Sequence, residues 1–403
     1  MGVSKNVLRV APGVESARPA FRGKARPAYV SEKNVYEAAL DRIRWLYDEF
    51  DGRISVSTSG GKDSTVVMEL ALMVAKEKGC LPLDVMWLDQ ECEYAATVNY
   101  MRGLHARPEL SLRWYQIPFR LYNSTNHDYP WLNVWGEGEE WVRPKEPYSI
   151  HVNDFLDRKG EPISRFKDLL QAINARQGGV NLTGMRTEES PARRLALTTN
   201  PTYKWATWGS MGKPLPDGGV SHYLMHPIYD WSFKDIWKAI YDHGWAYNTH
   251  YDVQFQYGVP VRNMRVSNYH HETALSALLY LQEAEPETWE AATKRLHGIN
   301  TYSHIGKESV PEELPYMFRD WEEYLFHLID NLCDKEEYRE TYRAMYEKVR
   351  RLTPENWKDD MCKRVARAVV NNDLYGTTID MFLIGVRGSN PSKGLNGEKV
   401  PSS

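Results

Sequence analysis

The chain has 403 residues, which is enough for one large domain or for two to three ordinary ones. Hydrophobic residues at 42% and charged residues at 26% exclude a wholly disordered chain. The net charge of −4 argues against a general polyanion-binding protein. The four cysteines form no C-x-x-C pair and indicate a reducing compartment. With neither a signal-peptide core nor an apolar run of ~20 residues, we expect a cytoplasmic protein without membrane association.

The N-terminal part combines an irregular arm with one amphipathic helix. Residues 1–30 are rich in Arg, Pro and Gly, which predicts a flexible arm. A helix is expected next, because apolar residues then recur at steps of three and four. This apolar stripe consists of Tyr36, Leu40, Ile43, Tyr47 and Phe50.

Strands and helices then alternate along the chain. Strands are predicted at 53–57, 83–88, 110–117 and 180–183. Helices are predicted between the first three strands, at 65–78 and 95–104. This alternation predicts an α/β fold in which a doubly wound parallel sheet is covered by helices on both faces.

The remaining pattern divides the chain into regions. A nucleotide-binding α/β domain is predicted at 31–260, with an aromatic insertion at about 120–165. A helical C-terminal domain is predicted at 261–387, and a disordered tail at 388–403. Ser232 and Asp235 form a predicted capping box for a helix at 233–243. The helices expected further on lie at 270–283, 286–297, 317–333, 335–351 and 357–372.

A Ser- and Gly-rich loop joins the first predicted strand to the next helix. It reads SGGKDS over residues 59–64. The glycines allow backbone N–H groups to turn inward, and the helix presents unpaired N–H groups and its positive dipole end to an anion. It is not a Walker A loop, since Lys62 is followed by Asp63 and not by Ser or Thr. We therefore predict a phosphate-binding loop of another kind.

This loop resembles that of the PP-loop ATP pyrophosphatase superfamily, which reads SGGxDS. Lys62 points to its branch similar to 3′-phosphoadenosine-5′-phosphosulfate (PAPS) reductases. In that superfamily the loop grips the phosphates of ATP or of the sulfonucleotide, and members typically adenylate a substrate and release pyrophosphate. The resemblance implies an adenine nucleotide alpha hydrolase-like fold, with ATP or PAPS and Mg²⁺ as ligands.

Further segments support the same branch. They are 87–91 (WLDQE), 183–190 (TGMRTEES) followed by Arg193 and Arg194, and 226–231 (HPIYDW) running into 235–237 (DIW). Over roughly residues 35–376, the chain also resembles the bacterial and phage group around the immunoglobulin-binding regulator IbrA, described as PAPS sulfotransferase/reductase-related. The segments that carry this second resemblance are 244–248 (GWAYN), 251–252 (YD), 258–260 (GVP), 264–266 (MRV), 297–300 (HGIN), 362–364 (CKR) and 371–373 (NND) with Tyr375.

The loop and the resemblance together define a candidate site. Lys62, Asp63 and Asp89 are the predicted catalytic residues. Asp63 and Asp89 are also predicted to hold Mg²⁺, because this ion prefers carboxylates together with phosphates, and Glu91 is a further candidate. The predicted nucleotide- and phosphate-binding residues are Ser57, Ser59, Gly60, Gly61, Lys62, Asp63, Ser64, Gly184, Arg186, Arg193 and Arg194.

The arginines in this set have two interpretations. Guanidinium groups match phosphate or sulfate oxygens in a bidentate way, which favours a role in anion binding. Alternatively, the arginines belong to a solvated helix start, with Glu188 and Glu189 as partners. An anion-binding role predicts that Arg186 and Arg194 serve the ligand and not the fold.

The sequence departs from true PAPS reductases at the position of their nucleophile. Those enzymes use a cysteine in a C-terminal Glu-Cys-Gly-type motif, whereas no cysteine follows Cys362 here. The cysteine pairs of iron–sulfur relatives are absent too, and no Cys or His spacing fits a zinc site. We therefore predict neither an iron–sulfur cluster nor zinc.

Three functions remain open. The first is a PP-loop enzyme that converts ATP to AMP and pyrophosphate while adenylating an unidentified acceptor. The second is a PAPS-binding reductase or sulfotransferase, and the third is a nucleotide-sensing regulatory subunit acting through a protein partner. We expect a protein partner or a homo-oligomer, whereas the net charge does not indicate nucleic acid.

Overall fold

The computed structural model describes most of the chain between residues 33 and 383. The described residues are 33–126, 131–199, 202–214, 220–271, 275–299, 310–333, 335–354, 357–374, 376, 379–380 and 383. The predicted N-terminal arm and C-terminal tail lie outside them. Among the helices of these residues, none combines the length and the apolar character needed to span a membrane.

The chain forms two compact units built from interleaved segments. The first unit comprises Met1–Asp89, Ala95–Ile117 and Lys145–Val266. The second comprises Gln90–Tyr94, Pro118–Pro144 and Ser267–Ser403. The domain boundaries drawn from the sequence, at 31–260 and 261–387, stay a prediction, and they differ from these units in being continuous.

The first unit contains a six-stranded sheet with the order β3-β2-β1-β6-β8-β7. All neighbouring strands pair in parallel except β7 and β8, which are antiparallel. The strands are β1 (Ile54–Ser57), β2 (Leu83–Leu88), β3 (Leu110–Tyr115), β6 (Val180–Leu182), β7 (Gly209–Met211) and β8 (Tyr223–Met225). The predicted α/β class and the four predicted strands are confirmed, whereas β7 and β8 were not predicted.

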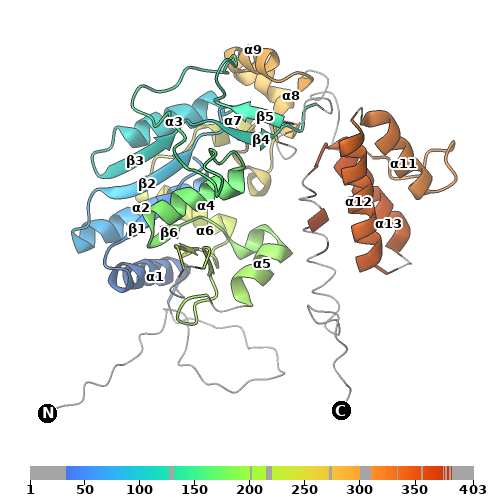
Figure 1. Ribbon diagram of the computed structural model, residues 1–403. Helices are drawn as coiled ribbons and strands as arrows, with labels where there is room; N and C mark the ends of the chain where they lie inside the picture. Colours follow the sequence, from blue (N-terminus) through green and yellow to red (C-terminus); the bar gives the residue numbers. More distant parts are fainter. Residues whose placement is uncertain are drawn as a thin grey trace, which may run out of the picture. The chain divides into compact units, whose positions relative to one another are not determined.

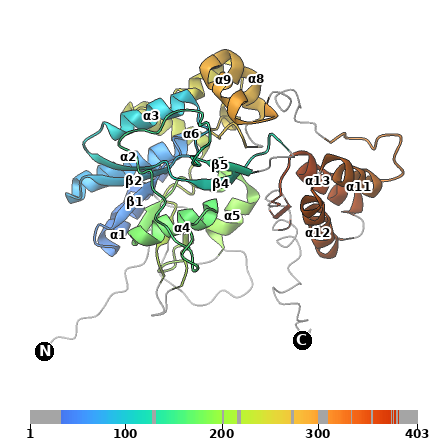
Figure 2. The same ribbon diagram turned by 45° about the horizontal axis from the view of Figure 1, so that its top comes forward.

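Helices cover both faces of this sheet. α2 packs against β1 and β2, and α3 packs against β3. α4 lies on the opposite face (Figures 1 and 2), as right-handed crossovers require when the chain returns from β3 to β6. The helices of this unit are α1 (Val35–Glu49), α2 (Lys62–Lys78), α3 (Ala95–His105), α4 (Phe166–Gln177), α5 (Pro191–Thr198), α6 (Phe233–His243) and α7 (His250–Gln256), with 3-10 turns η1 (Thr187–Glu189) and η2 (Val261–Asn263).

The strand order creates a switch point between β1 and β6. The chain leaves β1 toward β2 on one side and leaves β6 toward β7 and β8 on the other, so the loops after β1 and β6 diverge. In open α/β sheets, ligands bind at such a point, outside the carboxyl ends of the strands. α2 also begins at Lys62, earlier than the predicted start at residue 65. Lys62, Asp63 and Ser64 therefore belong to the first turn of the helix.

The second unit contains one strand pair and a group of helices. β4 (Phe119–Tyr122) and β5 (Trp131–Val134) pair antiparallel within the aromatic insertion, for which the sequence showed no periodicity. The three C-terminal helices pack together (Figure 1) around buried side chains such as Tyr342, Tyr346 and Cys362. The helices are α8 (Leu275–Ala284), α9 (Pro286–Arg295), α11 (Trp321–Leu332), α12 (Glu336–Leu352) and α13 (Lys358–Val370).

The capping box of α6 gives a test of the local structure. The Ser232 hydroxyl accepts the Asp235 N–H, and the Asp235 carboxylate accepts the Ser232 N–H at 2.7 Å. We expect Ser232→Ala to lower the free energy of unfolding by about 1 kcal/mol, measured by urea denaturation. The control is Lys234→Ala at an exposed position of the same turn, which should stay within about 0.5 kcal/mol of the unchanged protein. Equal effects of the two changes would contradict the capping role.

Candidate functional site

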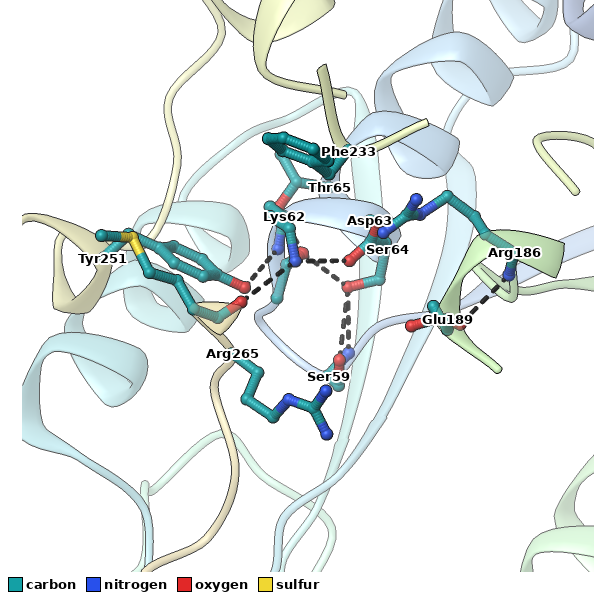
Figure 3. Close-up of polar contacts among 12 residues, drawn as sticks. Ser59, Lys62, Asp63, Ser64, Thr65, Arg186, Glu189, Phe233, Tyr251 and Arg265 are labelled. Carbon is teal, nitrogen blue, oxygen red and sulfur yellow. Dashed lines mark hydrogen bonds and ion pairs between the residues drawn. The ribbon is translucent and has the colours of Figure 1, made fainter. Parts of the chain in front are cut away.

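The predicted phosphate loop lies where β1 leads into α2 (Figure 3). Gly60 has a φ of +70°, a backbone conformation that favours glycine. Gly61 is the N-cap residue, and no side chain caps the helix there. The Ser64 hydroxyl donates to the Gly61 carbonyl oxygen at 2.9 Å and accepts the Ser59 N–H at 3.3 Å. The loop is therefore held by its own serines, while the first-turn amides of α2 have no acceptor within the helix.

Asp63 lies between two cationic side chains at this helix end (Figure 3). Lys62 Nζ is 3.0 Å from one carboxylate oxygen, and Arg186 Nε is 2.6 Å from the other. Lys62 is buried, and its ammonium group also donates to the Met264 carbonyl oxygen at 3.3 Å. The Asp63 carboxylate is thus shared between Lys62 and Arg186.

Arg186 is bonded within the fold as well as to Asp63. Its side chain is buried and donates to Glu188 at 2.9 Å and to the Trp231 carbonyl oxygen at 3.2 Å. Removing it would take one donor from each of two carboxylates and from a carbonyl oxygen. We therefore expect Arg186 to contribute to stability. The prediction from the sequence had assigned this residue to the ligand and not to the fold.

The next two arginines differ in their surroundings, although both lie on α5. Arg193 forms an ion pair with Glu189, and partial burial lowers the pKa of its guanidinium group, with repulsion from Arg265 as the second cause. Asp63 counteracts this shift, and Arg186 adds to it. Both residues are exposed, but within the described residues no hydrogen bond or ion pair links the Arg194 side chain to this group of charges. The structure therefore brings Arg193 toward the loop and does not do so for Arg194.

Three residues that sequence analysis did not assign to the site contact the loop or its charges. The Asn248 amide donates to the Gly60 carbonyl oxygen at 3.2 Å, and the Tyr251 hydroxyl accepts the Lys62 N–H at 2.9 Å. Arg265 extends toward the loop in Figure 3, and Gln254 binds both its backbone N–H and its carbonyl oxygen. Asn248, Tyr251 and Arg265 lie in segments that carried the resemblance. The sequence motifs therefore included these residues but did not assign them a role in the site.

Two of the predicted phosphate-binding residues, Gly184 and Ser57, make contacts that serve the fold. Gly184 follows β6 and packs directly on the loop, because a Cβ atom there would lie 2.7 Å from the Asp63 carbonyl carbon and 2.8 Å from the Ser64 nitrogen. Ser57 lies at the end of β1, and its hydroxyl donates to the Asn181 side chain at 2.8 Å. Gly184 therefore allows close approach of two backbones, and Ser57 bonds across the sheet.

The predicted metal-binding carboxylates are engaged by other groups. Asp89 is fully buried, and one of its oxygens accepts from Trp114 Nε1 at 2.7 Å and from Gln116 Nε2 at 3.0 Å. The described residues contain no group of three or more His, Cys, Asp or Glu side chains that could hold a metal ion. Because both oxygens of Asp63 face cations, the residues present do not fit a resident Mg²⁺ site, and that role of Asp63 and Asp89 stays a prediction that these contacts do not favour.

Glu91 is part of the core of the second unit. It is fully buried, forms an ion pair with Arg295 at 2.7 Å, and accepts the Trp135 N–H at 2.9 Å. These bonds occupy both carboxylate oxygens, since the Val142 N–H reaches the other one at 3.3 Å. Its interpretation as a further Mg²⁺ ligand is therefore replaced by a structural one.

A phosphate-type loop at the switch point of a doubly wound sheet defines a nucleotide-binding α/β protein of the PP-loop class. Residues 53–313 match the family model described as the phosphoadenosine phosphosulfate reductase domain. The chain belongs to this family. The matched residues include the loop, Arg186, Arg193 and Arg265, which confirms the resemblance drawn from the motifs.

Curated relatives extend this assignment. The uncharacterized protein YbdN of Escherichia coli (strain K12) is 28% identical over 85% of this chain and 89% of its own length. The phosphoadenosine 5′-phosphosulfate reductase of Vibrio campbellii is 23% identical over 52% of this chain and 66% of its own length. The similarity to the named reductase is thus confined to about half of the chain.

Solved structures give weaker likenesses. The PAPS reductase of Candida auris, in a phosphate complex, has a TM-score of 0.31 at 17% identity and covers 55% of this chain and 85% of that one. The FMN adenylyltransferase of Candida glabrata has a TM-score of 0.33 at 14% identity and covers 56% of this chain and 62% of that one. The family assignment accordingly rests on the sequence match.

The contact between Gly184 and α2 gives a test that needs no ligand. Gly184→Ala places a methyl group against the backbone of Asp63 and Ser64, and we expect it to lower the free energy of unfolding by about 1–3 kcal/mol. Hydrogen exchange should accelerate in the first turn of α2. The control is Gly103→Ala within α3, where no atom lies within 4 Å of the new methyl group and helix propensity favours alanine. A Gly184→Ala protein as stable and as protected as the Gly103→Ala protein would contradict the close contact.

Proposed function

We propose that the chain binds an adenine nucleotide, with its phosphate groups on the loop, and that it converts ATP to AMP and pyrophosphate while adenylating an acceptor. The observation that carries the proposal is the excess of positive charge at the amino end of α2. Lys62, Arg186, Arg193 and Arg265 gather there with three carboxylates, those of Asp63, Glu188 and Glu189, so the cations outnumber the acids. Such an excess is costly without an anion, and a polyphosphate relieves it.

The proposed chemistry uses these groups for positioning and for charge stabilisation. An oxygen of the acceptor attacks the α phosphorus, the bond to the bridging oxygen breaks, and pyrophosphate leaves with the bonding electron pair. The first-turn amides and Lys62 face the phosphate chain, and Arg193 and Arg265 stabilise the negative charge that develops on the departing group. Asp63 keeps Lys62 and Arg186 in place through its two oxygens.

The two neighbouring arginines of α5 provide the test of this proposal. We expect Arg193→Ala to weaken ATP binding about ten- to hundred-fold, since a charge-assisted hydrogen bond is worth roughly 1.5–3 kcal/mol. Arg194→Ala, as the matched control on the same helix, should change the affinity less than about threefold. Isothermal titration calorimetry with ATP in the presence of MgCl₂ measures both. Equal losses, or no ATP binding by the unchanged protein, would contradict the proposed site.

A second candidate function is a PAPS-binding reductase or sulfotransferase, which the family and the name of the Vibrio relative favour. A reductase of the thiol-dependent kind needs a cysteine thiolate that can attack sulfur. Cys80 is exposed but lies just before β2, at the amino ends of the parallel strands. The loop lies at their carboxyl ends. Cys92, Cys333 and Cys362 are buried. Burial raises the pKa of Cys362 to about 12 and that of Cys92 well above its ordinary value.

These thiols lead to a prediction that separates the two candidates. A variant with all four cysteines changed to Ser should keep its nucleotide binding and its pyrophosphate release. Pyrophosphate release from ATP and sulfite release from PAPS are measured on the variant and on the unchanged protein. Thioredoxin-dependent sulfite release that is lost in Cys362→Ser would establish the reductase instead. Nucleotide binding without release of either product would favour the third candidate, a regulatory subunit that acts through a protein partner.

A further inference from the structure

Tyr251 lies in the interior of the first unit, against the amino end of α2. Its side chain is only 3% exposed, and its ring contacts Trp237 edge-on with ring centroids 5.2 Å apart. The Lys62 ammonium nitrogen lies 5.5 Å from the centre of the Tyr251 ring. The Tyr251 hydroxyl accepts the Lys62 N–H at 2.9 Å (Figure 3). The position of Tyr251 is therefore fixed by packing on one side and by the loop on the other.

The hydroxyl oxygen of Tyr251 accepts one hydrogen bond, from the Lys62 N–H. A phenol carries one hydrogen beside its two lone pairs, and this hydrogen can donate a bond of its own. Burial raises the pKa of Tyr251, and the Asp63 carboxylate adds to this shift, so the hydrogen is present at neutral pH.

The surroundings of this hydrogen lack an available protein acceptor among the contacts of the described residues. Tyr251 lies close to Gly61, where a Cβ atom would be 3.4 Å from the hydroxyl oxygen. The nearby Asp63 carboxylate is already shared by Lys62 and Arg186, and the Met264 carbonyl oxygen accepts from Lys62. A buried donor without an acceptor is costly, and an oxyanion on the loop would remove that cost.

We propose that Tyr251 is a binding residue of the site, whose hydroxyl donates a hydrogen bond to an oxygen of the anionic group bound on the loop. Its ligand is a phosphate or phosphosulfate chain, and only the nucleotide part of that ligand rests on the proposed function. Tyr251 thus accepts from the loop and donates to the ligand through the same oxygen. The residue links the placement of Lys62 to the binding of the anion.

Inorganic pyrophosphate and ATP serve as probes in titration calorimetry. Tyr251→Phe removes the hydroxyl and keeps the ring, and we expect it to weaken the binding of both probes about ten- to hundred-fold. Tyr247→Phe is the matched control, because its hydroxyl belongs to the same segment but donates to Asp252 at 2.8 Å. The control should bind both probes within about twofold of the unchanged protein. An unchanged affinity in Tyr251→Phe overturns the proposal.

A second variant separates donation to the ligand from a role that is only structural. Incorporation of 3-fluorotyrosine at position 251 makes the hydroxyl a stronger donor and a weaker acceptor. Donation to the anion predicts affinity for pyrophosphate equal to or tighter than that of the unchanged protein. If the hydroxyl only held the Lys62 N–H, fluorotyrosine would weaken binding as phenylalanine does, and this result overturns the proposal.

The two probes also keep this proposal apart from the proposed function. Binding of pyrophosphate but not ATP by the unchanged protein would refute the proposal that the ligand is a nucleotide. The role of Tyr251 would then be decided by the pyrophosphate titrations alone. Binding of neither probe would overturn both proposals. Binding of both, with loss in Tyr251→Phe and recovery with fluorotyrosine, supports both.

Discussion

The amino end of α2 has backbone N–H groups that the chain itself satisfies only in part. The N-cap is Gly61, which offers no side-chain acceptor, and the serines nearby bond to one another and to the Gly61 carbonyl oxygen. Among these N–H groups, and within the part of the chain that the structure describes, the Lys62 N–H alone donates to a distant side chain, the Tyr251 hydroxyl. A helix end of this kind, placed at a switch point of the sheet, favours an anion for reasons of both hydrogen bonding and charge.

The surrounding fold serves to hold this helix end in position. Gly184 brings the loop after β6 against the first turn of α2, which only a residue without a side chain allows. Arg186 ties the same turn to the segment before α6 through the Trp231 carbonyl oxygen. Segments that are more than 100 residues apart thus meet at Asp63. The proposed binding residues depend on this convergence, because α5 and the segment with Arg265 belong to different parts of the chain.

The sequence predicted those features that a short stretch of residues determines. The loop, its two flanking elements and the capping box of α6 follow from local patterns, and the structure confirms them. The start of α2 was wrong by three residues, since the polar residues of the loop resemble a turn although they form the first helical turn. β7 (Gly209–Met211) and β8 (Tyr223–Met225) were not predicted because neither contains a β-branched residue, whereas the equally short β6 begins with Val180. The bonds of Asp89 and Glu91 depend on Trp114, Gln116 and Arg295, which no local pattern links to them.

The mutual repulsion of Arg193 and Arg265 has a practical consequence for the choice of buffer. Sulfate and phosphate carry the same kind of oxygens as the proposed ligand, so on the proposed function these ions would compete for the two arginines. Each bound ion stabilises the folded state and has to leave before a larger ligand enters. If the loop binds a phosphate chain as proposed, a chloride buffer at moderate ionic strength would report its intrinsic affinity, whereas crystals grown from ammonium sulfate would trap an ion in place of the ligand.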